Sequence, residues 1–390
     1  MEVFIISAAR TAIGGFGGSL RDLSIAKIAN PVMDHVVMQA GINKEDIDDI
    51  ILGNAFDLQY GNVARVCALL GGYTHEVPGM TVDRTCTSSM EAVNIGALKI
   101  KAGQAEIILA GGVESMSTTP YLLPQLRWGS RMRSSKAIDI LWDGMQDPIY
   151  GIGMGLTAEK LAEIHHISRE EQDKVAFRSH KNASEATKEG RFKGEIVPLK
   201  VPIKGGETIF ERDEHVREGI SLEALSKLKP AFKENGTVTA GNACGMNDGA
   251  AMTILMSEKK VKELDVTPLA RIVSYGAVAV DPTIMGWGPV PATRKALKRA
   301  GLEMDDIELI EINEAFAAQY IACEKGLGFE REIANVNGGG IALGHPIGAT
   351  SARLITTLIY EMKRRKNRYG LATICGGGGL GSSIVIENLQ

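Results

Sequence analysis

The sequence predicts an α/β protein made of two similar halves and a different middle segment. Short apolar runs that predict buried strands alternate with stretches that predict helices, which is the pattern of an α/β fold. A 17-residue stretch near the N-terminus recurs 260 positions later. The segment between about residues 119 and 246 is more polar and irregular than its flanks. Two related halves around an insertion account for all three observations.

The first half begins with three predicted strands. Residues 3–7, 47–52 and 107–110 are short runs dominated by Val, Ile and Leu, as in strands buried in a sheet. Residues 88–101 lie between the second and third strands and are rich in Ala, Val, Ile and Leu, so we expect a helix there.

The repeat supports a duplication. Residues 40–56 match residues 300–316 at seven of 17 positions. After each copy the chain continues with a turn, a helix, a strand and a glycine cluster. This shared order indicates that the two halves have the same architecture.

The middle segment contains two predicted helices. Residues 157–165 have a helical apolar face. Ser168 and Glu171 form a capping box, and the helix that they begin is expected to end near residues 189–190. We interpret the segment as a lid or substrate-binding domain.

The last elements are a strand at 307–312, a helix at 351–365 and a strand at 383–387. Glycines at 376, 378 and 381 formally match a dinucleotide-binding fingerprint, but that motif must open a helix. A strand follows here, so we interpret the glycines as a turn between two strands. Its free N–H groups would suit an oxyanion hole.

Composition excludes several functional classes. Lys plus Arg is 43 and Asp plus Glu is 47, so the net charge of −4 gives no support for a nucleic-acid partner. No apolar run is long enough to span a membrane, and no signal peptide is expected. The five cysteines are widely spaced without a C-x-x-C pair, which predicts reduced thiols in a cytoplasmic protein and no zinc site. Eleven of the 45 glycines lie between Gly338 and Gly381, which indicates tight turns or close approach to a ligand.

Four side chains are candidates for chemistry. Cys86 precedes a predicted helix, whose N-terminus is expected to lower the thiol pKa, although an average cysteine is a small buried residue. His345 lies in a glycine cluster; histidine is the usual base for a thiol nucleophile, whereas a lone histidine is more often structural. Asn313 follows a predicted strand and is either functional or an ordinary turn residue. Cys375 borders the glycine turn and could exchange protons.

Together with further motifs, these residues resemble the thiolase family over essentially the whole chain. The matching motifs are Cys86, Asn313-Glu-Ala-Phe, Gly344-His-Pro, Cys375-Gly-Gly-Gly-Gly, Ala110-Gly-Gly-Val-Glu-Ser-Met, Thr239-Ala-Gly-Asn-Ala-Cys-Gly-Met-Asn-Asp-Gly and Asp281-Pro-Thr-Ile-Met-Gly-Trp-Gly-Pro-Val-Pro.

The resemblance implies two duplicated βαβαβαββ halves stacked in five α-β-α-β-α layers, with an inserted loop domain. We expect the first half at 1–118 and 247–268, a loop domain that binds coenzyme A at 119–246, and the second half at 269–390. Thiolases are homo-oligomers, tetramers or dimers, and residues 121–135 are expected to mediate tetramer contacts.

The resemblance also assigns roles. Cys86 would be acylated after activation by His345, and Cys375 would be the second acid and base. One oxyanion hole would use His345 and a water held by Asn313. The other would use the N–H groups of Cys86 and Gly377. Coenzyme A (CoA) is substrate and product, so no cofactor or metal is expected.

The residues implied to contact CoA or the acyl group are Arg217, Phe232, Ala240, Cys244, Met154, Met285 and Phe316. Arg217 alone could also be a solvated surface charge. The chain departs from the family at Gly153, where many short-chain thiolases have histidine, and at Cys244, where serine is usual. Asp83 and the serines at 88–89 also differ from the common pattern around the nucleophile. None of these changes removes a catalytic group.

The resemblance implies acetyl-CoA C-acetyltransferase activity, which joins two acetyl-CoA into acetoacetyl-CoA. The alternative is a 3-ketoacyl-CoA thiolase that cleaves longer 3-oxoacyl-CoA in fatty-acid breakdown. A carrier-protein ketosynthase would combine its cysteine with two histidines, whereas this chain has Cys375 and Asn313. A non-catalytic thiolase-like subunit would have lost its nucleophile or base, and this chain has both.

Overall fold

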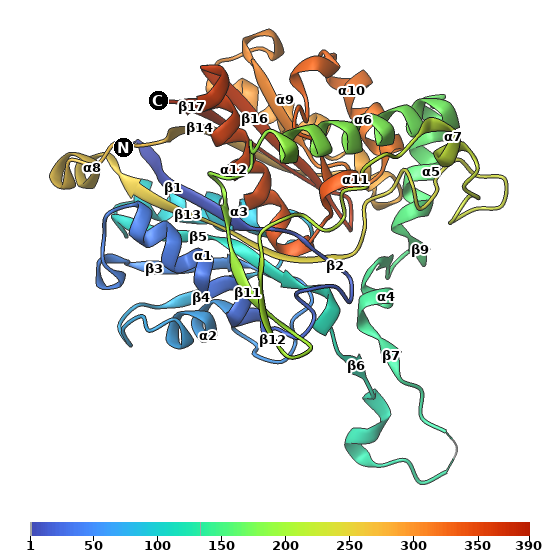
Figure 1. Cartoon of the computed structure of the whole chain (residues 1–390), viewed down its shortest axis with the longest axis horizontal. Helices are drawn as coiled ribbons and strands as arrows, with labels where there is room; N and C mark the ends of the chain where they lie inside the picture. Colours follow the sequence, from blue (N-terminus) through green and yellow to red (C-terminus); the bar gives the residue numbers. More distant parts are fainter. Residues whose placement is uncertain (1, 133) are drawn as a thin grey trace.

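The computed structural model describes residues 2–132 and 134–390, and a long mixed sheet runs through its centre (Figure 1). The strand order is β15-β16-β17-β14-β1-β13-β5-β3-β4. The strands of the first half are β1 (Val3–Thr11), β3 (Asp49–Gly53), β4 (Gly79–Val82), β5 (Ile107–Ser115) and β13 (Asn247–Ser257). Those of the second half are β14 (Ala270–Ala279), β15 (Leu309–Ile312), β16 (Tyr369–Gly376) and β17 (Leu380–Asn388).

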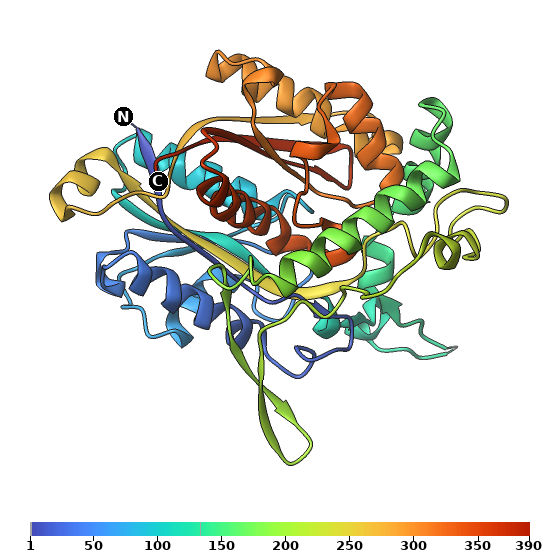
Figure 2. The same ribbon diagram turned by 45° about the horizontal axis from the view of Figure 1, so that its top comes forward.

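Six helices complete the expected five layers. α1 (Ile25–Gln39) and α2 (Val63–Leu70) pack on the outer face of the first half, and α9 (Pro289–Ala300) and α10 (Ala317–Leu327) on that of the second. α3 (Ser88–Lys101) and α12 (Ile347–Arg365) lie between the halves (Figures 1 and 2). α12 contacts β5 and β13 of the first half as well as β16 of its own half. The α-β-α-β-α prediction is therefore confirmed.

The duplication is visible in local structure. Short capping boxes at Asn43–Asp46 and Glu303–Asp306, 260 positions apart, precede β3 and β15. β3 pairs in parallel with β5, and β15 pairs in parallel with β16. The two capping boxes therefore precede equivalent strands in the two halves.

The middle segment packs against the second half through two helices. α5 (Met154–Ile164) and α6 (Arg169–Lys188) contact α10, and α6 also contacts α11 (Gly340–Leu343). The Ser168 hydroxyl accepts from the Glu171 N–H at 3.2 Å and the Glu171 carboxylate accepts from the Ser168 N–H at 2.8 Å, so the predicted capping box is confirmed. The other elements of this segment are β6 (Tyr121–Leu122), β7 (Ile138–Asp139), α4 (Ile140–Gly144), β8 (Gln146–Asp147), β9 (Ile152–Gly153), β10 (Ile196–Val197), β11 (Leu199–Ile203), β12 (Gly206–Phe210) and α7 (Leu222–Ser226).

Two parts of the segment stand away from the layers. The arm that carries β6 and β7 projects from the body in Figure 1, and the β11–β12 hairpin projects in Figure 2. Tyr121, Trp128 and Met132 on the arm have exposed side chains. Two remaining short elements are β2 (Gly14–Gly15), which pairs with β13, and α8 (Glu258–Leu264), which follows β13.

Element bounds follow local chemistry closely. α3 has the predicted limits, and α12 begins four residues earlier than predicted because Pro346 already serves as its N-cap. β5 extends beyond residue 110 because helices cover both of its faces, which buries all nine residues. Within residues 2–132 and 134–390, every helix is too short or too polar to cross a membrane.

Candidate active site

The candidate catalytic residues meet at one pocket of about 510 Å³. Cys86, His345, Cys375 and Gly377 line it, together with loop-domain side chains. Most of its wall is apolar, which suits a pocket that excludes water around a reacting thioester.

Cys86 lies in a strained turn between β4 and α3. Thr85, the residue before it, has a φ of +49°, a left-handed conformation that is costly for a β-branched residue. The Asp83 carboxylate accepts from the Thr85 N–H at 2.8 Å, and the Thr85 hydroxyl donates to the Gly377 carbonyl at 3.3 Å. These contacts fix the thiol beside the glycine turn of the second half.

The expected low pKa of Cys86 is wrong for the unliganded protein. Burial raises the pKa of this thiol to about 11, although the N–H groups of Gly377 and Cys86 favour the thiolate. The carboxylates of Glu114 and Asp83 raise the pKa further. Burial therefore outweighs the effect of the backbone N–H groups at the start of α3, and Cys86 is a neutral thiol at rest.

His345 has the protonation state of a base. Its ring Nδ1 lies 2.7 Å from the Thr350 hydroxyl, which itself donates to the Pro346 carbonyl at 2.8 Å. The hydroxyl proton is thus engaged, so Nδ1 carries the ring proton and Nε2 has a free lone pair. Nε2 has no hydrogen-bond partner among the described residues. Burial, and then the charge of Arg353, lowers the pKa of His345 to about 3, so the ring is neutral at pH 7.

Two more thiols share the pocket. Cys375 is buried at the end of β16, and burial followed by the nearby thiol of Cys86 raises its pKa well above the ordinary value. Burial also raises the pKa of Cys244 to about 12. Cys375 is therefore a neutral thiol at rest, which is the form of the side chain that can donate a proton.

Asn313 directly follows β15 and is not one of the residues that line the pocket. Its side chain is fully buried, and neither amide atom has a partner among the described residues. Its backbone N–H donates to the Thr373 carbonyl at 3.0 Å, which holds the residue at the end of the sheet. A buried amide with unused hydrogen-bonding capacity is suited to hold a small polar group.

The structure brings together most of the predicted substrate-contacting residues. Phe232, Cys244, Met154, Met285 and Phe316 all line the pocket. Arg217 is exposed, and neither it nor the exposed Ala240 is part of the lining.

Sequence reasoning missed several supporting residues. Thr350 fixes the His345 ring, and the Asn247 side chain accepts from the His345 N–H at 2.9 Å. Asn247 belongs to the Gly-Met-Asn-Asp-Gly motif, which was a usable signal, whereas Thr350 is one of many threonines. The pocket wall also includes Met116, Trp142, Met145, Gln146, Met246 and Ile347.

Comparisons with known proteins agree over the full length. Residues 3–259 match the family model described as thiolase, N-terminal domain, and residues 266–388 match thiolase, C-terminal domain. An acetyl-CoA acetyltransferase of Syntrophomonas wolfei is 48% identical, covering 100% of this chain and 99% of that protein.

Solved structures give the same result. The crystal structure of the Bacillus anthracis acetyl-CoA acetyltransferase matches with a TM-score of 0.98 and 47% identity, covering 100% of this chain and 99% of that one. The human mitochondrial 3-ketoacyl-CoA thiolase in complex with CoA matches with a TM-score of 0.96 and 40% identity, covering 100% and 98%.

Proposed function

Because the chain belongs to the thiolase family, we propose that it is an acetyl-CoA acetyltransferase, which reversibly converts two acetyl-CoA into acetoacetyl-CoA and CoA. The observation that carries the proposal is the convergence of Cys86, His345 and Cys375 on one apolar pocket. The relatives of 48% and 47% identity bear this name, which favours it over the longer-chain activity of the relative of 40% identity.

The first half-reaction is acyl transfer. Nε2 of His345 takes the proton of the Cys86 thiol as the sulfur attacks the thioester carbon of acetyl-CoA. The carbon–sulfur bond to CoA then breaks, and the His345 proton passes to the departing thiolate. Both the Cys86 thiol and the His345 imidazole are uncharged before this transfer begins. The products are acetyl-Cys86 and CoA.

The second half-reaction makes the carbon–carbon bond. After CoA leaves, Cys375 gives its proton to Nε2 of His345, and the resulting thiolate removes the α-proton of a second acetyl-CoA. The resulting enolate carbon attacks the acetyl-Cys86 carbonyl, and the bond between that carbon and the Cys86 sulfur breaks. Acetoacetyl-CoA leaves, His345 gives its proton to the Cys86 sulfur, and Cys375 keeps the α-proton as its thiol. In cleavage, the same thiol protonates the departing enolate.

Two groups of donors would stabilise the oxyanions. We assign the enolate oxygen to the Nε2–H of His345, which is protonated at this stage, and to a water on the unpartnered amide of Asn313. We assign the tetrahedral intermediate at Cys86 to the N–H groups of Cys86 and Gly377.

Acyl labelling tests the mechanism. Incubation with radiolabelled acetyl-CoA should label the wild-type chain at Cys86, and Cys86→Ser should abolish stable thioester labelling. Cys375→Ser should still be labelled but should not form acetoacetyl-CoA. Equal labelling of Cys86→Ser and wild type would contradict the acyl-cysteine mechanism.

One observation favours the longer-chain alternative. Gly153 lines the pocket, and a Cβ added to it would meet no atom within 4 Å, so there is space where many short-chain thiolases have a histidine. Cleavage rates with acetoacetyl-CoA and 3-oxooctanoyl-CoA separate the two activities. A higher kcat/KM for 3-oxooctanoyl-CoA would replace the short-chain proposal.

Binding, assembly and location complete the proposal. We assign CoA to the loop domain, with Arg217, Phe232, Ala240 and Cys244 along its path. We propose that the domains meet at residues 118/119, 246/247 and 268/269. The arm at residues 121–135 is proposed to join copies into a homo-oligomer, supported by its exposed Tyr121, Trp128 and Met132; position 133 lies outside the described residues. The free thiols of the pocket suit the reducing cytoplasm.

A further inference from the structure

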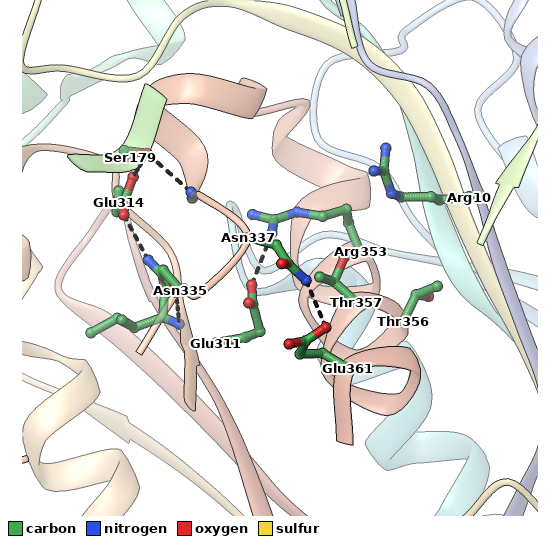
Figure 3. A network of polar contacts seen from close by, with 12 residues as sticks. Arg10, Ser179, Glu311, Glu314, Asn335, Asn337, Arg353, Thr356, Thr357 and Glu361 are labelled. Atoms are coloured by element: carbon green, nitrogen blue, oxygen red, sulfur yellow. Dashed lines mark hydrogen bonds and ion pairs between the residues drawn. The ribbon is translucent and has the colours of Figure 1, made fainter. Parts of the chain in front are cut away.

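One hydroxyl of the loop domain connects two catalytic segments of the second half. Ser179 of α6 is 1% exposed. Its hydroxyl donates to the Glu314 carboxylate at 2.6 Å and accepts from the Gly339 N–H at 3.0 Å (Figure 3). Glu314 directly follows Asn313, and Gly339 begins the glycine segment that leads to His345.

The Glu314 carboxylate holds both segments in place. One oxygen accepts from the Asn335 side chain at 2.8 Å, and the other accepts from the Ile341 N–H at 3.3 Å. The Asn335 side chain also pairs with the backbone N–H and carbonyl of Ile312, at 2.9 and 2.8 Å. The end of β15 and the start of the glycine segment are therefore joined through a single carboxylate.

Close packing leaves this junction little freedom. A Cβ added to Gly338 would lie 2.6 Å from the backbone carbonyl oxygen of Ser179, and one on Gly339 would lie 2.3 Å from the Glu314 carboxyl carbon. A Cβ on Gly340 would lie 2.7 Å from the Asn313 side-chain oxygen. Successive glycines thus bring the backbone against α6 and against the Asn313 turn.

The glycine segment then leads to His345 by a short path. α11 occupies one turn after Gly339, and the Gly344 N–H donates to the Gly340 carbonyl at 2.9 Å. A shift at Gly339 therefore changes the distance between His345 and Asn313. By contrast, the Cys86 turn is tied to Gly377, and the hydrogen bonds of the Ser179 hydroxyl go to Glu314 and Gly339 instead.

Neighbouring residues of α6 anchor the same region. The Arg178 guanidinium donates to the carbonyls of Arg331 and Ala334 at 2.6 and 2.9 Å, and the Asn182 amide donates to the Asn335 carbonyl at 3.3 Å. The helix is thus fixed on the second half on both sides of Ser179.

We propose that Ser179 is a positioning residue that sets the spacing of Asn313 and His345 for making and breaking the carbon–carbon bond. The inference rests on the proposed function, in which these two residues hold the enolate oxygen. Burial raises the pKa of Glu314, and the hydrogen bond from Ser179 opposes this rise, so removal of the hydroxyl raises the pKa further. Protonation of Glu314 would further weaken the hydrogen bond that its carboxylate accepts from the Ile341 N–H.

The two half-reactions separate this role from general stability. Exchange of the acetyl group between acetyl-CoA and labelled CoA needs Cys86, His345 and the Gly377 N–H. Cleavage of acetoacetyl-CoA also needs the matched spacing of His345 and Asn313. Since both rates are measured on one preparation, the fraction of folded protein cancels in their ratio.

The test compares Ser179→Ala with Ser184→Ala, a buried serine on the same helix and outside this junction. Ser179→Ala should lower kcat for cleavage about 10- to 100-fold, while exchange and KM change less than about threefold. Ser184→Ala should keep the wild-type ratio.

A cleavage-to-exchange ratio in Ser179→Ala within about threefold of wild type would overturn the positioning role, as would an equal change in Ser184→Ala. If wild-type protein exchanges acetyl groups but cleaves no 3-oxoacyl-CoA, the proposed function fails instead, and this inference with it.

Discussion

At the scale of single residues, the site combines a neutral thiol with a neutral imidazole. Burial raises the pKa of Cys86 and lowers that of His345, so neither side chain is charged at pH 7. A thiolate forms only when a proton moves between them. This arrangement protects the nucleophile from random electrophiles until a thioester occupies the pocket.

Alkylation of Cys86 tests its pKa. The thiolate fraction of a group with a pKa of about 11 is roughly one thousandth at pH 8 and rises about tenfold per pH unit. Iodoacetamide labelling of the Cys86 peptide, followed by mass spectrometry, should therefore accelerate steadily between pH 7 and pH 10. A rate that is already constant from pH 7 upward would show a low pKa and contradict the burial argument.

Thr350 should control the tautomer of His345. In Thr350→Val the ring proton can move to Nε2, which then cannot accept the Cys86 proton, so kcat should fall about tenfold or more with little change in KM. Thr356→Val is the matched control, since Thr356 is buried on the same helix and donates to the Ala352 carbonyl. Equal losses of kcat in the two variants would assign the effect to the helix rather than to the ring.

At the scale of elements, the close approach of α12 to the first-half sheet positions His345. A Cβ on Gly112 of β5 would lie 2.1 Å from the Gly348 carbonyl oxygen, at the first turn of α12. His345 lies only three residues before Gly348. The helix can therefore rest this close only while position 112 has no side chain.

Gly112→Ala should displace that helix end. We expect a loss of stability of about 3 kcal/mol and most of the activity, because the new methyl group meets backbone atoms that cannot rotate away. Gly206→Ala is the control, since a Cβ there meets no atom within 4 Å, and it should stay within about 0.5 kcal/mol of wild type. Thermal melts and thiolysis rates give both values, and normal activity of Gly112→Ala would refute the close-packing argument.

Prediction from sequence succeeded where the cause is local. The α3 limits and the Ser168 capping box follow from neighbouring residues, and the motifs singled out three side chains, Cys86, His345 and Cys375, that the structure brings to one pocket. The prediction of a lowered pKa for Cys86 was wrong because the burial of this thiol depends on segments far along the chain. The Ser179–Glu314 contact spans 135 positions, and no local pattern encodes it.

At the scale of the whole molecule, the halves share one core. The central hydrophobic cluster contains Ile5 and Val93 of the first half with Leu354, Leu358 and Ile384 of the second. Removal of either half would expose the inner face of the other. The pocket that holds Cys86, His345 and Cys375 therefore depends on both halves being folded.

The halves should consequently unfold together. Urea unfolding followed by far-UV circular dichroism and by tryptophan fluorescence should give coincident transitions, because the shared cluster couples the two halves. Two separated transitions, or a soluble folded fragment of residues 266–390 alone, would contradict this coupling.

The strand order has a consequence for synthesis of the chain. β1 is made first, yet its register partner for Val3 is Ser257, which lies 257 − 3 = 254 positions later. At about 5–20 residues per second, a ribosome needs roughly 13–50 s to make that stretch. β5 waits for the same strand, so the edges of β1 and β5 that pair with β13 stay unpaired until β13 emerges. Chaperone cover of the growing N-terminal half is most valuable during this interval, when neighbouring nascent chains can pair with those edges.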